Sequence, residues 1–108
     1  MSRGDIVVVA TKGAYTSKPR PALVVQASRF NETHASITVC PISSSPVDAP
    51  IFRLTLPPGT RTGLKQASQV MIDKIVSVPR EAIGRTVGRC DPEELEAVDD
   101  ALRGWLEL

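Results

Sequence analysis

The sequence DPEELEAVDDALRGW at residues 91–105 contains the clearest structural element of the chain. Asp91 is a good helix cap, Pro92 suits the first helical position, and Glu94 stands three residues after the cap, as in a capping box. Apolar residues then follow at spacings of three and four. They are Leu95, Val98, Leu102 and Trp105. This pattern predicts an amphipathic helix that packs its apolar stripe on a sheet or on a partner.

The chain before this helix is divided into short apolar runs by prolines and glycines, as in small β-rich domains. Residues 6–10 and 21–26 are rich in branched apolar side chains, and residues 36–40 and 52–56 alternate between apolar and polar. Residues 69–78 predict one or two further strands, because Asp73 and Lys74 interrupt the alternation with a bulge or a strand end. Three loops separate the strands, at residues 11–19, 43–50 and 57–65.

Length and composition indicate one ordered domain over residues 1–108. Hydrophobic residues make up 42% of the chain and charged residues 23%, which excludes the highly charged class that stays unfolded. No apolar run is long enough to cross a bilayer, and the N-terminus has no secretory pattern. We therefore expect a cytoplasmic protein without a membrane segment.

The charges are unevenly distributed along the chain. Residues 1–90 contain 12 Lys and Arg against 5 Asp and Glu, whereas residues 91–108 contain 1 against 7. A basic body suits a polyanionic partner, because Lys and Arg displace counterions from phosphates. Acidic residues in the first turn of a helix also complement its dipole, so the acidic tail has a structural explanation of its own.

The chain contains few cysteines and histidines, the residue types that most often bind metal ions or take part in nucleophilic and acid–base catalysis. Cys40 and Cys90 are isolated from each other and from a second ligand at metal-binding spacing, which indicates reduced, structural thiols and no metal site. His34 is the only histidine and the only side chain of the type best suited to proton transfer, although a lone surface histidine is more often inert. No cofactor is expected.

Several segments, in order, resemble the MazF/PemK toxins. They are RGDIVVV at residues 3–9, TKG at 11–13, PRPALVV at 19–25, TVCPIS at 38–43 and SQVMIDKI at 68–75. With the C-terminal helix, the resemblance covers essentially the whole chain. It implies a mainly β (α+β) fold, an SH3-like barrel of the CcdB/PemK/MazF type with a twisted antiparallel sheet and a C-terminal α-helix.

The resemblance also implies a function. A protein of this kind is the toxin of a type II toxin–antitoxin system, a homodimeric, metal-independent and sequence-specific endoribonuclease that a cognate antitoxin protein holds in check. It cuts single-stranded RNA by attack of the 2′-hydroxyl on the adjacent phosphorus, leaving 2′,3′-cyclic phosphate and 5′-hydroxyl ends. The family's catalytic positions correspond to Arg20 and Ser43 in this sequence.

The chemistry of these two residue types suits that reaction. The planar guanidinium of Arg20 can bind two phosphate oxygens and stabilise the charge of the phosphorane, although arginine holds its proton too tightly to be a ready base. Ser43 can donate to or orient the phosphate. Without the resemblance, a structural ion pair at a strand start would be an equally good reading of Arg20.

Seven further residues are predicted to bind RNA. Lysines in the first loop can contact phosphates, the tyrosine can stack on a base, and the polar residues near Ser43 can orient the backbone or read a base edge. These residues are Lys12, Tyr15, Thr16, Lys18, Ser44, Ser68 and Gln69. Each also has a simpler reading, because loop lysines are usually only solvated and Gln69 can equally pair a strand.

Two other functions fit the same fold. A gyrase poison of the CcdB type depends on a C-terminal Trp-Gly-Ile, whereas this chain ends GWLEL at residues 104–108. A barrel that only binds RNA or a partner is the other alternative. It is favoured if the departures from the family pattern disable the site: Tyr15 and Thr16 replace a frequent Glu-Gln pair, and Ser68 replaces an Asp found in several members.

Overall fold

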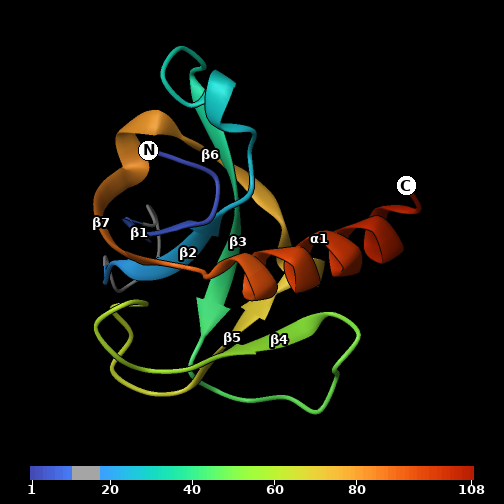
Figure 1. The fold of residues 1–108 in the computed structure, drawn as a ribbon. Helices are drawn as coiled ribbons and strands as arrows, with labels where there is room; N and C mark the ends of the chain where they lie inside the picture. Colours follow the sequence, from blue (N-terminus) through green and yellow to red (C-terminus); the bar gives the residue numbers. More distant parts are fainter. Residues whose placement is uncertain (11–17) are drawn as a thin grey trace.

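Seven strands and one α-helix form the part of the chain that the computed structural model describes, which is residues 1–10 and 18–108 (Figure 1). Three short 3₁₀ turns connect some of these elements. In chain order the elements are β1 (Asp5–Val9), β2 (Arg20–Val24), η1 (Ser28–Phe30), β3 (Ser36–Ser43), β4 (Arg53–Leu56), β5 (Ser68–Met71), η2 (Ile72–Lys74), β6 (Val76–Pro79), η3 (Arg80–Ala82), β7 (Ile83–Arg89) and α1 (Pro92–Leu106).

The sheet is antiparallel and is built around β3. Its strand order is β4-β5-β3-β2-β1-β7, and β6 also pairs with β3. β3 pairs with β2 along one side, while its other side pairs with β6 in its first half and with β5 at Ile42 and Ser43. The eight-residue β3 is therefore the element that fixes the position of the others.

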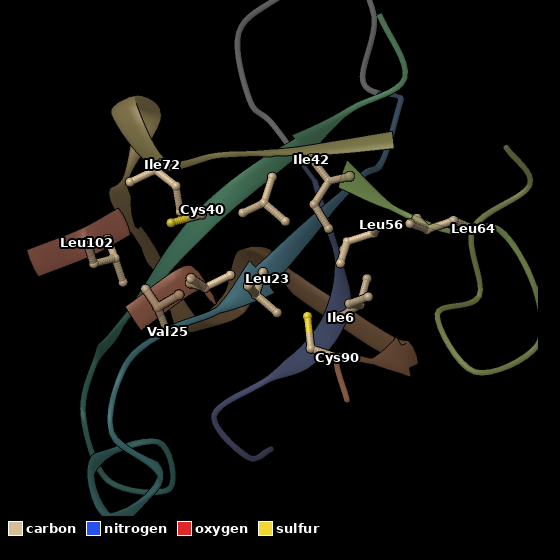
Figure 2. Packing of buried hydrophobic residues seen from close by; sticks show 12 residues of the cluster. Ile6, Leu23, Val25, Cys40, Ile42, Leu56, Leu64, Ile72, Cys90 and Leu102 are labelled. Carbon is tan, nitrogen blue, oxygen red and sulfur yellow. The ribbon is translucent and has the colours of Figure 1, made fainter. Parts of the chain in front are cut away.

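One face of this sheet carries the main hydrophobic core, which α1 covers. Ile6, Leu23 and Cys40 lie on neighbouring strands and are completely buried. Val98 and Leu102 of α1 belong to the same cluster, whose sheet side chains Figure 2 shows pointing toward one another. Burial of a Val or Leu side chain contributes about 1.5–3 kcal/mol, so this contact is a major source of stability.

A smaller apolar cluster occupies the opposite face. It is formed by buried residues of β1, β2 and β3, with Met1 and residues of β6 to β7 packed at its margin. Its buried members are Val7, Val9, Ala22, Val24, Ile37 and Val39. Side chains on both faces of β3 are therefore buried over much of the strand, as expected for a central strand.

The helix begins as its sequence predicts. The side chain of Asp91 accepts a hydrogen bond from the main-chain N–H of Glu94 at 2.7 Å, and the side chain of Glu94 accepts one from the N–H of Asp91 at 2.9 Å. These reciprocal bonds satisfy two amide groups that have no partner within the helix. The capping box is confirmed, with Pro92 as the first helical residue.

Two arginines of the body bind carboxylates of α1. The guanidinium of Arg61 donates two hydrogen bonds to Glu94, at 2.6 and 3.0 Å, and one to the main-chain carbonyl of Arg89 at 3.1 Å. Arg3 lies 2.6 Å from Asp99. The acidic tail thus finds part of its charge compensation within the same chain.

Most strand predictions are confirmed, and one strand was missed. The predicted strands at 6–10, 21–26 and 52–56 correspond to β1, β2 and β4, and β3 is longer than the predicted 36–40. Residues 69–78 form two strands separated by η2, so Asp73 and Lys74 mark a strand end. β7 was not predicted from the sequence.

The geometry of β7 explains why glycines interrupt its pattern. A Cβ atom at Gly88 would lie 2.2 Å from the main-chain carbonyl atoms of Thr62, and one at Gly63 would lie 2.2 Å from the carbonyl oxygen of Val87. The loop between β4 and β5 therefore approaches β7 main chain to main chain. Only glycine permits this contact. Because glycine has no side chain, it also interrupts the apolar alternation by which a strand is identified in a sequence.

The cap of α1 provides a first test. We expect Asp91→Ala to lower the free energy of unfolding by about 1 kcal/mol, because an N-cap bond is lost. Asp100→Ala is the matched control, since this exposed carboxylate only pairs with Arg103 on the surface and should change stability by less than about 0.5 kcal/mol. Urea unfolding followed by circular dichroism measures both, and equal effects would contradict the role of the cap.

The ion pair between Arg53 and Asp73 predicts a dependence of stability on pH. Two hydrogen bonds from Arg53, at 2.9 and 3.1 Å, hold the pKa of the Asp73 carboxyl below its ordinary value of 3.8. A lowered pKa in the folded state gives stability that is present above pH 3.8 and is lost as pH falls through the folded value. Asp73→Asn should therefore destabilise the protein at pH 7 and flatten its acid unfolding curve below pH 4. An unchanged curve would exclude this contribution.

Candidate functional site

Four polar residues form a row across neighbouring strands on the sheet face opposite α1. In the β3–β5 and β4–β5 pairs, Ser43 lies opposite Gln69 and Gln69 opposite Thr55. The β2–β3 pair ends at Ala22 opposite Pro41. Arg20 lies two residues before Ala22 and Ser43 two residues after Pro41, so both side chains point to the same face near this end of the pair. Directly opposed residues of antiparallel strands point to the same face. We call Arg20, Ser43, Gln69 and Thr55 the polar row.

Arg20 begins β2 and is exposed. Its strand partner on the other side is Val9, which belongs to the smaller apolar cluster. Among the described residues none forms a hydrogen bond or ion pair with the guanidinium of Arg20. This contrasts with Arg3, Arg53 and Arg61, which are all engaged with carboxylates.

Ser43 is the last residue of β3 and is partly buried. Its Oγ accepts a hydrogen bond from the main-chain N–H of Ser45 at 3.1 Å. This bond occupies a lone pair and leaves the hydroxyl hydrogen available, because no described residue accepts it. The side chain can therefore donate a hydrogen bond to an oxygen placed beside it on the face that it shares with Arg20.

The remaining predicted residues around Ser43 lie close together but have different surroundings. Ser44 is exposed beyond the end of β3, whereas Ser68 is buried and donates its hydroxyl hydrogen to the carbonyl of Gln66 at 2.9 Å. Gln69 is partly buried and its side-chain amide binds the main chain of Val47. A small hollow of about 100 Å³ lies here. Its lining residues are Ser43, Pro46, Thr55, Ala67, Ser68 and Gln69.

The predicted residues of the first loop fall partly outside the structure's coverage. Lys18 is exposed two residues before Arg20, in the right place to add positive charge to the row. Lys12, Tyr15 and Thr16 lie outside the described residues. Their predicted contacts with RNA therefore stay predictions.

Thr55 was not predicted to belong to the site. It is exposed on β4, lies opposite Gln69 and lines the hollow beside Ser43. Its alternation with Leu54 and Leu56 made it look like an ordinary outward-facing strand residue. The signal that was missing from the sequence is the identity of the strand next to β4.

His34 and the cysteines lie away from the polar row. His34 is exposed before the first residue of β3, whereas Ser43 ends that strand, so about 23 Å of extended chain separates Ser36 from Ser43 alone. Cys40 and Cys90 are buried in the main core, and burial raises the pKa of both thiols to about 12. Both side chains are therefore neutral packing groups at physiological pH.

The described residues contain neither a metal-binding cluster nor a membrane-spanning helix. No group of three or more His, Cys, Asp or Glu side chains there is arranged to hold a metal ion. The single α-helix of this part of the chain is also too short and too polar to span a membrane.

Comparison with known proteins gives consistent matches over the full length. The family model for the PemK-like, MazF-like toxin of type II toxin–antitoxin system matches residues 2–106. A probable endoribonuclease MazF of Mycolicibacterium smegmatis is 46% identical over 108 residues, covering 100% of this chain and 98% of that protein. Endoribonuclease MazF9 of Mycobacterium tuberculosis is 33% identical over 116 residues, with 100% and 98% coverage.

A solved structure shows the same fold. It is an endoribonuclease in complex with its cognate antitoxin from a mycobacterial species, with a TM-score of 0.79, 18% identity, and coverage of 100% of this chain and 96% of the other. The predicted arrangement of an antiparallel sheet with a C-terminal helix is thus confirmed as a MazF-like fold. The chain belongs to the family of PemK-like, MazF-like toxins of type II toxin–antitoxin systems, and it is an endoribonuclease toxin of the MazF type.

Proposed function

We propose that this endoribonuclease cuts single-stranded RNA at the polar row, without a metal ion and with a preference for particular sequences. The observation that supports the proposal is the β2–β3 register, because Ala22 opposite Pro41 puts Arg20 and Ser43 on the same face near the end of this strand pair. A cation that has no partner among the described residues and a hydroxyl donor on the same face supply the positive charge and the hydrogen bond that suit a phosphodiester.

The proposed reaction uses the nucleophile that RNA carries. The 2′-oxygen attacks the adjacent phosphorus while its proton passes to a base, and a bond from that oxygen to phosphorus forms. The bond from phosphorus to the 5′-oxygen then breaks, and the 5′-oxygen takes up a proton. The products are a 2′,3′-cyclic phosphate and a 5′-hydroxyl, and no water is consumed.

In this proposal Arg20 stabilises charge and Ser43 orients the phosphate. The guanidinium binds two non-bridging oxygens, whose negative charge increases in the transition state. The hydroxyl of Ser43 donates to one of them, since its oxygen is already held by Ser45. His34 of the same protomer is too far along β3 to be the base.

The rest of the proposed function concerns partners. We propose that the single domain of residues 1–108 carries the whole activity in the cytoplasm, that two copies form the active homodimer, and that a cognate antitoxin protein inhibits it. The antitoxin is supported by the complex known for a mycobacterial endoribonuclease of the same fold. Lys18, Ser44 and the first-loop residues are assigned to contacts with the RNA backbone and bases.

Cleavage of RNA in EDTA tests the proposed chemistry. Arg20→Ala should lower kcat/KM by about 100-fold or more, because a charge stabiliser of the transition state is lost. Ser43→Ala should have a smaller effect of about tenfold. The measurement is cleavage of a long single-stranded RNA, with the product ends assigned by mass spectrometry as cyclic phosphate and 5′-hydroxyl.

Arg103→Ala is the matched control for the loss of one positive charge. Arg103 lies on α1, across the sheet from the row, and pairs only with Asp100 among the described residues. It should cut like the wild type. Full activity of Arg20→Ala, or loss of all cleavage in EDTA, would reject the proposed mechanism.

A further inference from the structure

The side chain of Gln69 forms an unusual pair of hydrogen bonds. Its Oε1 accepts a bond from the main-chain N–H of Val47 at 2.9 Å, and its Nε2 donates one to the carbonyl of the same residue at 3.0 Å. An amide that binds both groups of one residue imitates the pairing of a neighbouring strand. Both polar ends of the Gln69 side chain are therefore used within the protein.

These bonds hold the segment that follows Ser43. Residues 44–50 connect β3 with β4, and within the described structure the two Gln69 bonds are the only hydrogen bonds from this segment to a strand other than β3 and β4, which flank it. Val47 itself is half exposed, so burial contributes little to its position. Gln69 thus ties the middle of the segment to β5.

The segment also forms one wall of the hollow beside Ser43. Pro46 comes from the segment, whereas Ser43, Thr55 and Gln69 come from three adjacent strands. The volume of about 100 Å³ is somewhat below that of the ~150 Å³ cavity known to hold a benzene ring. The hollow therefore has room for part of a nucleobase beside Ser43.

We propose that Gln69 is a positioning residue that fixes the 44–50 segment over this hollow and thereby sets which base the enzyme accepts next to the scissile phosphate. The proposal rests on the proposed function, because it takes the polar row as the place of cleavage. It differs from direct reading of a base by Gln69, since that would require the amide to leave Val47. Specificity then depends on the shape of a wall that Gln69 holds in place.

Two substitutions break the tie from its two ends. Gln69→Met keeps the size of the side chain and removes both hydrogen bonds, whereas Val47→Pro removes the N–H donor on the other side. Val47→Ala is the matched control, because both bonds involve only the main chain of Val47. The three single variants, the double variant Gln69→Met/Val47→Pro and the wild type are compared on one long single-stranded RNA in EDTA, with all cut sites mapped by primer extension.

We expect Gln69→Met and Val47→Pro each to change the ratio of cleavage between the preferred and the next-best sites by about tenfold, which corresponds to the loss of one or two hydrogen bonds. The double variant should show no larger change than Gln69→Met, because both substitutions remove the same tie. Val47→Ala should keep the wild-type pattern. Circular dichroism verifies that each variant is folded.

Two results would overturn the proposal. An unchanged pattern of cut sites in a folded Gln69→Met would show that the amide has no effect on base choice. Multiplying effects in the double variant, with Val47→Pro mild, would indicate that Gln69 reads the base directly. Failure of the proposed function gives a different result from failure of the Gln69 proposal. The wild type would then leave the RNA intact, or Arg20→Ala would keep full activity, whatever result Gln69→Met gives.

Discussion

The hydrogen-bond register of β3 is the constraint on which the rest of the structure depends. This strand pairs with β2, β5 and β6, so its position determines which residues of three other strands meet. A slip of one residue would turn Cys40 and Ile42 out of the main core and turn Ser43 into it. The same alternation therefore builds the core under α1 and presents the polar row on the other face, which couples the stability of the fold to the geometry of the proposed site.

Local signals explain which parts of the fold were predictable from the sequence. The start of the helix could be placed to the residue because Asp91, Pro92 and Glu94 act within one turn, and the strands before it follow from short-range alternation. β7 was not predicted because Gly84 and Gly88 stand where side chains would otherwise show the alternation of a strand. Their reason is the close approach of distant main chain, which no local signal contains.

The site was predictable only in part, for a related reason. Arg20 and Ser43 were named from the family resemblance, but their neighbourhood arises from the pairing of segments more than 20 residues apart. Thr55 was missed because alternation shows that a residue faces outward without showing what lies beside it. Burial of Ser68 and the bonds of Gln69 to Val47 are likewise products of tertiary structure. Residue types indicate possible chemistry, and only strand pairing brings them together.

The acidic helix also has a consequence for the molecule as a whole. α1 lies on one side of the sheet, with carboxylates that are partly neutralised by Arg3 and Arg61, while Arg20 and Lys18 are exposed elsewhere. This separation gives the chain an electric dipole although its net charge is only +1. A polyanion is repelled by one side and attracted by the other, so collisions are biased toward productive orientations. Encounter should accordingly slow as added salt shortens the range of this field.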